Sequence, residues 1–217
     1  MNFQIDRNVF QDGLNQVQSV VSPRTTLPVL SNVLIEADEL GLKLSTTDLD
    51  VAISMRVPAQ VEGTGATTLP AKRLASIVRE LAGQEVQIKV DPDNAAEVKS
   101  GPSFFKILGL GSDEFPKVEI EDARSFVFDQ KLFKDAMKKT SYAISTDETR
   151  YVLNGVNCVI GEGKFTLVAT DGRRLAMVEQ DFELEGADEK TEVIIPTKCV
   201  HELQRLLKDE GEMKVSL

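Results

Sequence analysis

The sequence has little of the chemistry that most enzymes and metalloproteins use. Its 217 residues include one histidine, two cysteines, two tyrosines and no tryptophan. Cys158 and Cys199 share no close spacing, so the sequence predicts neither a metal site nor a disulfide framework. We expect both cysteines to be small buried side chains in a reducing, cytoplasmic setting, and we expect no cofactor.

Long hydrophobic runs and targeting signals are also missing. No apolar run approaches the roughly 20 residues that a membrane-spanning helix needs, so no membrane partner is expected. The first residues, Met1-Asn2-Phe3-Gln4-Ile5-Asp6, lack the basic region and apolar core of a signal peptide. The sequence contains neither a P-loop nor a glycine-rich dinucleotide fingerprint.

Candidate catalytic groups are few. The single histidine, His201, lies two residues from Cys199 on a predicted helix, and residues at that spacing point to different sides of a helix. Asp48 and Asp171 each follow a predicted strand, which leaves open a carboxylate-dependent hydrolase or transferase with one site per half of the chain. The alternative is that each carboxylate organises a hairpin turn, which is the commoner role of Asp there.

The chain repeats itself at an offset of 123–126 residues. Asp6-Arg7-Asn8-Val9-Phe10 corresponds to Asp129-Gln130-Lys131-Leu132-Phe133, and Ser45-Thr46-Thr47-Asp48 to Val168-Ala169-Thr170-Asp171. Leu69-Pro70-Ala71-Lys72 corresponds to Ile195-Pro196-Thr197-Lys198. This offset far exceeds the roughly 20–50 residues of a solenoid repeat. It predicts a duplicated module large enough to have its own core.

The second copy has no counterpart for the stretch of the first copy that runs from roughly position 91 to Ile120. We therefore expect a first domain at residues 1–122 and a second at residues 123–217 that is truncated at its C-terminal end. On this expectation the chain is a fragment.

Each copy is predicted to have the same order of elements. A short strand leads to Asp6 or Asp129 as a helix N-cap, followed by an amphipathic helix and strands of alternating pattern. The hairpins turn at 38–41 and 161–163. A second helix follows Pro70 or Pro196, and a last strand closes the pattern. The first copy adds a hairpin over 97–108, and residues 109–122 read as a linker. The fold class is α+β, with two helices packed on an antiparallel sheet.

The charge distribution contrasts with the net charge of −10. Segments 72–80, 131–139 and 198–208 carry net charges of +2, +3 and +2, which leaves −17 for the rest of the chain. On the second helix of each copy, Lys72 and Arg79, or Lys198 and Arg205, lie opposite the apolar stripe. Both pairs are seven residues apart, about 10 Å along the axis.

The first helix of each copy carries polar outward positions that lack acidic side chains: Lys131, Lys134 and Lys138 in the second copy, and Asn8, Gln11 and Asn15 in the first. A solvated helix face explains one such surface, but four helices that avoid acid on one face favour contact with phosphates. Few aromatic residues are interleaved, so stacking on bases is not indicated.

At this point the sequence resembles the bacterial DNA polymerase III β subunits, the sliding clamps. The resemblance covers the whole chain. It rests on 26–32 (Thr-Leu-Pro-Val-Leu-Ser-Asn), 45–49 (Ser-Thr-Thr-Asp-Leu), 113–116 (Asp-Glu-Phe-Pro), 151–155 (Tyr-Val-Leu-Asn-Gly) and above all 168–176 (Val-Ala-Thr-Asp-Gly-Arg-Arg-Leu-Ala).

What the resemblance implies is a non-catalytic processivity factor with the DNA-clamp fold. Its three similar domains would form a head-to-tail dimeric ring around duplex DNA, and it would bind the polymerase III α subunit, the clamp loader and repair proteins. The implied DNA-side residues are Arg24, Arg73, Arg79, Arg150, Tyr151, Lys198 and Arg205.

The resemblance also implies two contact surfaces for proteins. The partner-peptide pocket would include Leu153, Thr170, Gly172, Arg173, Arg174 and Leu175, where Arg173 replaces a histidine found in some members. The dimer edge would include Phe104, Phe105, Ile107 and Leu108. Because the third domain is expected to be absent, we expect no closed ring and only weak binding of a Gln-Leu-x-Leu-Phe peptide.

Overall fold

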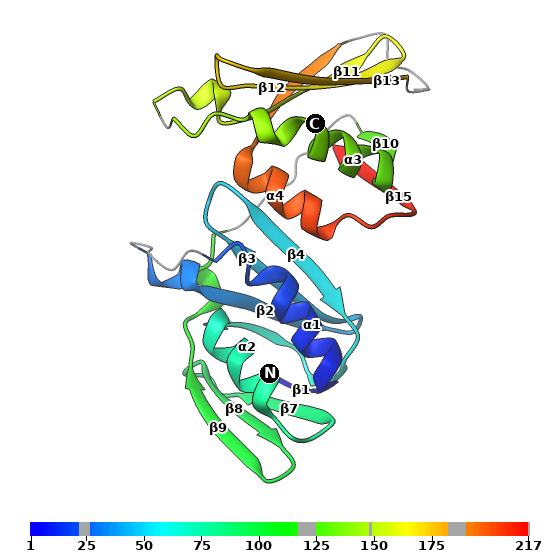
Figure 1. Cartoon of the computed structure of the whole chain (residues 1–217). Coiled ribbons are helices and arrows are strands. Elements are labelled where there is room, and N and C mark those ends of the chain that lie inside the picture. Colours follow the sequence, from blue (N-terminus) through cyan, green and yellow to red (C-terminus); the bar gives the residue numbers. More distant parts are fainter. Residues whose placement is uncertain (22–26, 117–124, 148, 182–189, 217) are drawn as a thin grey trace. The chain divides into compact units, whose positions relative to one another are not determined.

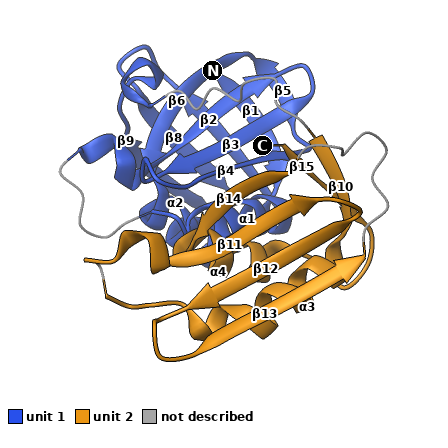
Figure 2. Ribbon diagram, turned by 90° about the horizontal axis from the view of Figure 1, so that it is seen from above, with its two compact units in different colours: residues 1–118 blue, residues 119–217 orange. Residues whose placement is uncertain are grey.

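The computed structural model describes residues 1–21, 27–116, 125–147, 149–181 and 190–216. The chain divides into two compact units, Met1–Val118 and Glu119–Leu217 (Figures 1 and 2). Arg24, one of the implied DNA-side residues, lies outside the described residues.

Unit 1 contains two α-helices and two antiparallel sheets. In chain order its elements are β1 (Asn2–Asp6), α1 (Arg7–Val17), the 3-10 helix η1 (Pro28–Ser31), β2 (Asn32–Asp38), β3 (Gly41–Thr47), β4 (Ala52–Val57), β5 (Gln60–Gly63), β6 (Gly65–Pro70), α2 (Ala71–Glu80), β7 (Glu85–Val90), β8 (Ala95–Ser100), β9 (Ser103–Leu108) and the 3-10 helix η2 (Ser112–Glu114). One sheet has the order β4-β3-β2-β6 and the other the order β5-β1-β7-β8-β9.

Unit 2 repeats this arrangement with fewer strands. Its elements are β10 (Ser125–Asp129), α3 (Gln130–Thr140), the 3-10 helices η3 (Ser141–Ala143) and η4 (Tyr151–Leu153), β11 (Gly155–Gly161), β12 (Lys164–Thr170), β13 (Leu175–Asp181), β14 (Thr191–Pro196), α4 (Thr197–Leu206) and β15 (Glu212–Ser216). The sheets have the orders β13-β12-β11-β14 and β10-β15. Figure 2 shows α3 and α4 on one face of the four-stranded sheet.

The two units share their topology, as the repeat predicts. The order β4-β3-β2-β6 corresponds to β13-β12-β11-β14, and the pair β1-β7 to β10-β15. The register agrees too, because Leu34 faces Thr68 in unit 1 and Asn157 faces Ile194 in unit 2. The expectation of one sheet per module needs correction. Each described unit has two sheets, and β5 joins the second one by pairing with β1.

Local signals in the sequence position the first helix of each unit. The Asp6 carboxylate accepts hydrogen bonds from the N–H groups of Asn8 and Val9 at 2.8 and 3.0 Å. The Asp129 carboxylate accepts one from Leu132 N–H at 2.8 Å. Side-chain oxygens at this position satisfy N–H groups that a helix start leaves without partners. Both predicted N-caps are confirmed.

Each unit buries an apolar core between its helices and sheets. In unit 1 the α1 residues Phe10 and Leu14 pack with Leu74 and Val78 of α2. In unit 2 the rings of Phe128, Phe133 and Phe165 lie 5.2–5.9 Å apart, a spacing at which aromatic pairs attract. Because the apolar stripe of each helix faces its own core, the opposite face of that helix is left for solvent.

Candidate functional site

The second helix of each unit presents basic side chains away from its core. On α2, Leu74 and Val78 are fully buried, whereas Lys72, Arg73 and Arg79 are exposed. On α4, Val200 is buried, Arg205 is exposed and Lys198 is half-buried. The structure therefore places Arg73, Arg79, Lys198 and Arg205 on the non-core faces of equivalent helices.

These faces also carry acid. Arg79 Nε lies 3.1 Å from a carboxylate oxygen of Glu80, and Arg205 Nη2 lies 2.7 Å from one of Glu202. The Arg79–Glu80 pair is mostly exposed, and such pairs contribute at most about 1 kcal/mol. An incoming phosphate can therefore replace Glu80 as the partner of Arg79. Lys72 and Arg73 make no ion pair with any residue that the structure describes.

The first helix of unit 2 does not avoid acidic neighbours, which corrects the sequence-based interpretation. Lys131 Nζ lies 2.7 Å from an Asp135 oxygen one turn along α3, and Lys134 Nζ lies 2.9 Å from Asp209 beyond α4. Hydrogen bonding to Asp135 raises the pKa of Lys131. These lysines are partly compensated within the unit, so α3 is a less basic surface than its composition indicates.

Arg150 and Tyr151 lie at the start of η4. Tyr151 is 79% exposed and contributes no core packing. Arg150 Nε donates to Asp147 Oδ2 at 2.9 Å, and the carboxylate of Asp147 also accepts bonds from the hydroxyl and N–H of Thr149. These contacts hold the pKa of Asp147 below its usual range, with the Thr149 hydroxyl as the main cause.

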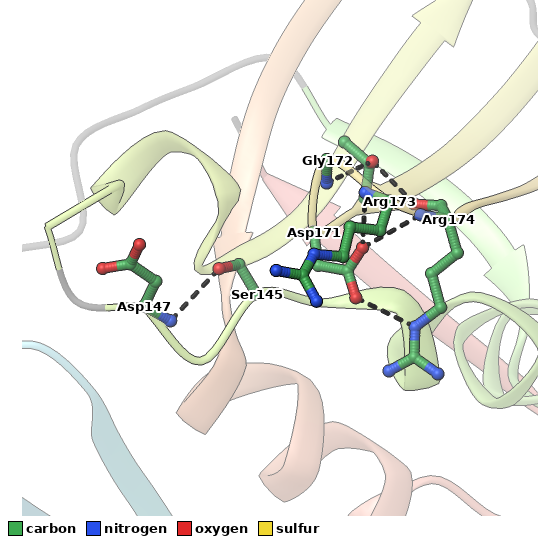
Figure 3. Close-up of polar contacts among 7 residues, drawn as sticks. Ser145, Asp147, Asp171, Gly172, Arg173 and Arg174 are labelled. Atoms are coloured by element: carbon green, nitrogen blue, oxygen red, sulfur yellow. Dashed lines mark hydrogen bonds and ion pairs between the residues drawn. The ribbon is translucent and has the colours of Figure 1, made fainter.

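Residues 170–174 form a tight turn between β12 and β13. Gly172 has φ +87°, in the left-handed region that favours glycine. Its N–H donates to the Thr170 hydroxyl at 3.1 Å, and that hydroxyl donates to the Arg174 carbonyl at 2.7 Å. Arg174 folds back so that its Nε donates to Asp171 Oδ2 at 3.0 Å (Figure 3).

Two further residues contact this turn. A side-chain carbon at Gly172 would lie 3.3 Å from Nη1 of Arg150, so Arg150 stands against the glycine. The guanidinium carbon of Arg174 lies 5.7 Å from the centre of the Tyr142 ring, in cation–π range. Sequence reasoning missed Tyr142, because its repeat partner is Ser19 and no motif marks it. It also did not foresee that Arg150, one of the implied DNA-side residues, places its guanidinium beside this turn.

The equivalent turn in unit 1 has the same bonds but a leucine in place of the glycine. Leu49 N–H donates to the Thr47 hydroxyl at 3.0 Å, and Asp48 Oδ1 accepts from Val51 N–H at 2.9 Å. Leu49 has φ +81° and is 61% exposed. The backbone of this turn is therefore compatible with a larger residue at the left-handed position.

Asp48 and Asp171 use their carboxylates to stabilise turns. Asp171 Oδ1 accepts hydrogen bonds from the N–H groups of Arg173 and Arg174 at 2.9 and 3.0 Å. These bonds, that from Arg173 first, hold the pKa of Asp171 below its usual range. A general base works best with a pKa near the operating pH, so a depressed pKa disfavours that role.

A cleft of about 630 Å³ lies in unit 2 between η4 and β14. We call it the β14 groove; residues that line it include Val152, Leu153, Asn157, Thr170, Glu192 and Ile194. Of the six residues implied for the peptide pocket, the structure brings Leu153 and Thr170 into this groove. Gly172, Arg173, Arg174 and Leu175 belong to the neighbouring exposed turn and strand start.

The predicted edge strand is β9, the last strand of its sheet. Phe104, Phe105 and Leu108 are 54%, 40% and 73% exposed. Ile107 is 1% exposed and belongs to the core of unit 1, so its assignment to the dimer edge is wrong. It faces Ala96 across the β8–β9 pair, on the side of the sheet that packs inward.

The remaining chemistry of the described residues is sparse. Burial raises the pKa of the Cys158 thiol to about 12 and also raises that of Cys199. Within the described ranges, no cluster of three His, Cys, Asp or Glu side chains can hold a metal ion. Among the same residues, no helix is both long enough and apolar enough to cross a bilayer.

Comparison with known proteins identifies the class. The family described as DNA polymerase III beta subunit, N-terminal domain, matches residues 1–119, and the family described as its central domain matches residues 127–217. The two units of this chain therefore match two consecutive domains of the sliding clamps. The chain belongs to the DNA polymerase III beta subunit family.

Individual relatives agree with this assignment. The chain is 37% identical over 223 residues to a beta sliding clamp of Halalkalibacterium halodurans, covering 98% of this chain and 59% of the relative. It is 35% identical over 218 residues to one from Chlamydia muridarum, covering 100% and 59%. The chain therefore spans about 59% of the length of these relatives.

Solved structures give the same result. The DNA polymerase III subunit beta of Pseudomonas aeruginosa matches with a TM-score of 0.95 and 35% identity, over 100% of this chain and 60% of that one. A sliding clamp of Bartonella birtlesii, solved bound to griselimycin, matches with a TM-score of 0.90 and 38% identity, again over 100% and 60%. The expected clamp fold is confirmed.

Proposed function

We propose that this chain provides two domains, residues 1–122 and 123–217, of a DNA-encircling processivity factor that tethers the replicative polymerase. The observation that carries the proposal is the matched pair of basic residues on equivalent helices. Lys72 and Arg79 on α2, and Lys198 and Arg205 on α4, keep the same seven-residue spacing on the non-core face.

Such a surface suits DNA binding without sequence reading. Lys and Arg side chains that meet phosphates fix position on the duplex but carry no base information. The exposed Arg79–Glu80 pair opens at low energetic cost, whereas Arg205 is held by the less exposed Glu202. We therefore infer that α2 makes the stronger phosphate contacts. The role is non-catalytic and implies a cytoplasmic location.

Neutralising this surface tests the proposal. A variant with Lys72, Arg79, Lys198 and Arg205 changed to Gln should bind duplex DNA more weakly. The slope of log affinity against log salt should fall by about 0.9 for each phosphate that the protein no longer neutralises. A matched control neutralises Lys43, Arg56, Lys99 and Lys164, which lie on strands and pair with carboxylates. An equal reduction of slope in both variants would contradict the proposal.

Partner proteins are proposed to bind at the turn 170–174 of unit 2. Gly172 leaves room beside Arg150, and Leu175 is exposed at the start of β13. Arg174 can exchange its exposed Asp171 partner for an acidic or carbonyl group of a peptide. Changing Arg174 to Ala should weaken binding of a Gln-Leu-x-Leu-Phe peptide in a fluorescence titration, whereas Lys164→Ala at the far end of β12 should not.

The exposed apolar edge of β9 is proposed as the surface through which copies of the longer relatives associate. Edge strands offer unpaired backbone groups, and Phe104, Phe105 and Leu108 add apolar contact area. Sedimentation of the chain and of a Phe104→Ser, Leu108→Ser variant tests this. The wild-type chain should show the stronger concentration dependence, and identical behaviour would contradict the assignment.

A further inference from the structure

The second helix of each unit carries the same two basic positions, but only α4 has a carboxylate between them. Glu202 lies four residues after Lys198 and three residues before Arg205. Its counterpart in α2 at the repeat offset is Ser76. On a helix of 3.6 residues per turn, these spacings put the three side chains on one face. The non-core face of α4 is therefore basic, acidic and basic again, whereas the face of α2 has a neutral side chain in the middle.

Arg205 holds Glu202 through two charged donors. Nε and Nη2 of Arg205 both donate to Oε2 of Glu202, at 3.0 and 2.7 Å. The side chain of Glu202 is only 14% exposed, and that of Arg205 is 39% exposed. A carboxylate that is mostly withdrawn from water depends on such donors for its solvation, so it keeps them more firmly than an exposed carboxylate does.

The charge of Glu202 changes the electrostatics of the whole helix face. Residues 71–79 of α2 contain three cations and no acid, a net charge of +3, whereas the equivalent residues 197–205 of α4 contain two cations and one acid, a net charge of +1. The charge also reaches Cys199, since burial raises the pKa of this thiol and Glu202 raises it further. The position of Cys199 is taken in α2 by Arg73, an exposed cation.

The α2 face offers its cations with less competition. Lys72 and Arg73 make no ion pair with the residues that the structure describes, and Ser76 between the basic positions is exposed. The Glu80 carboxylate that pairs with Arg79 has a side chain that is 74% exposed, and such pairs are weak. A phosphate that approaches α2 therefore meets available cations, whereas on α4 it must first displace Glu202 from Arg205.

We propose that Glu202 is a built-in competitor for DNA phosphates, which weakens the contact of α4 and leaves α2 as the main contact with the duplex. Its carboxylate occupies the same guanidinium donors that a phosphate would use, and it is always at hand because it belongs to the same helix. Contacts that bind phosphates only weakly are readily exchanged as a protein moves along the duplex. The inference rests on the proposed function, because it concerns the strength of the same DNA surface.

Glu202→Gln tests the proposal, since it removes the charge and keeps the size of the side chain. Binding of a fluorescein-labelled duplex to the chain is followed by fluorescence anisotropy at several salt concentrations. If Arg205 then neutralises one more phosphate, the slope of log affinity against log salt should steepen by about 0.9. From a common affinity near 1 M salt, this slope gives about eightfold tighter binding at about 0.1 M.

Ser76→Glu is the reciprocal variant. It places a carboxylate between Lys72 and Arg79, at an exposed position where the core is not disturbed. The slope should become shallower by about 0.9 for each phosphate contact that is lost, with weaker binding at low salt. Because this variant adds to the surface only, it decides the question even if Glu202→Gln destabilises α4. Unchanged binding by Ser76→Glu would overturn the proposal.

Two controls separate competition from net charge. Glu179→Gln removes the same charge from a strand, where Glu179 pairs with Lys164 at 2.7 Å, and its slope should equal that of the wild-type chain. In a chain that already carries Lys198→Gln and Arg205→Gln, the added change Glu202→Gln should have no effect on the slope. An equal gain in Glu179→Gln, or a gain that survives without the two cations, would overturn the proposal.

The outcome is separable from that of the proposed function. If the chain with all four basic residues changed to Gln binds the duplex more weakly, but Glu202→Gln binds like the wild type, the DNA surface stands and only the competitor role of Glu202 is wrong. If the fourfold variant binds as tightly as the wild type, the DNA surface itself is wrong and the inference about Glu202 fails with it.

Discussion

Gly172 has two roles in the turn 170–174: it adopts the left-handed backbone conformation, and it leaves room for Arg150. Replacing Gly172 with alanine separates the two. The backbone there has φ +87°, and an added side-chain carbon would meet only the tip of Arg150 at 3.3 Å. A non-glycine residue in the left-handed region costs about 1–2 kcal/mol. The loss of unfolded-chain entropy on replacing glycine offsets about 0.4–1 kcal/mol of this. We therefore expect a net loss of about 1 kcal/mol in the free energy of unfolding.

Gly163 provides the matched control. It has φ +74° in the β11–β12 turn, and an added carbon there meets nothing within 4 Å. Gly163→Ala should therefore lose the same stability as Gly172→Ala, about 1 kcal/mol, or about 4–8 °C in the Tm of a unit of this size. Only Gly172→Ala should displace Arg150 and weaken binding of the Gln-Leu-x-Leu-Phe peptide.

Urea denaturation and peptide titration of the two variants give the answer. A loss above about 3 kcal/mol for Gly172→Ala alone would mean that Arg150 is rigidly held and that its clash with the added carbon, not the backbone, determines the cost. No loss in either variant would refute the left-handed conformation. Equal peptide affinity in the wild-type chain, Gly172→Ala and Gly163→Ala would refute the assignment of the turn to partner binding.

Three further predictions follow from single residues. Backbone N–H groups lower the pKa of Asp171 in the folded state. The stability that this carboxylate contributes is therefore present above its unfolded pKa and is lost as the pH falls through its folded pKa. An NMR titration should place the folded pKa below the usual Asp value, and a normal value would contradict the prediction. The Cys158 thiol, with a pKa of about 12, should resist alkylation at pH 8 until urea unfolds the chain, and rapid native labelling would contradict its burial. Phe115 is buried against Val29 and Leu30 of η1. Phe115→Ala should destabilise unit 1 by about 3 kcal/mol in urea denaturation and expose Val29, and a loss below about 1 kcal/mol would contradict this packing.

Features of the fold that depend on local chemistry could be predicted from the sequence. The N-caps at Asp6 and Asp129, the turn at 38–41 and the hairpin over 97–108 each follow from a few neighbouring residues. The repeat then supplied the equivalence of the two units. β5 was missed because its strand partner, β1, lies about 60 residues away, and nothing local marks that pairing.

The candidate site was less predictable because it, too, depends on contacts that neighbouring residues in the sequence do not mark. The basic positions on α2 and α4 follow from helical periodicity, but their carboxylate partners depend on side-chain conformation. Ile107 was assigned to the edge because its strand is exposed, although its side of the strand faces the core. The roles assigned to the DNA-side and pocket residues stay predictions. The packing of Phe115 on Val29 joins two motifs that lie 86 positions apart, and the sequence does not indicate that they touch.

The pairing of the first strand in each unit determines when that unit can fold during synthesis. β1 pairs with β7, where Asn2 faces Lys89, and β10 pairs with β15, where Ser125 faces Ser216. At a ribosomal rate of about 5–20 residues per second, each first strand waits roughly 4–18 s for its partner. β5, with which β1 also pairs, is synthesised before β7, so the sheet around Phe3 and Ile5 is incomplete during that interval, whereas Phe126 and Phe128 lack β15 altogether. Both halves of the chain therefore pass through a period in which nascent-chain chaperones have an aromatic segment to bind.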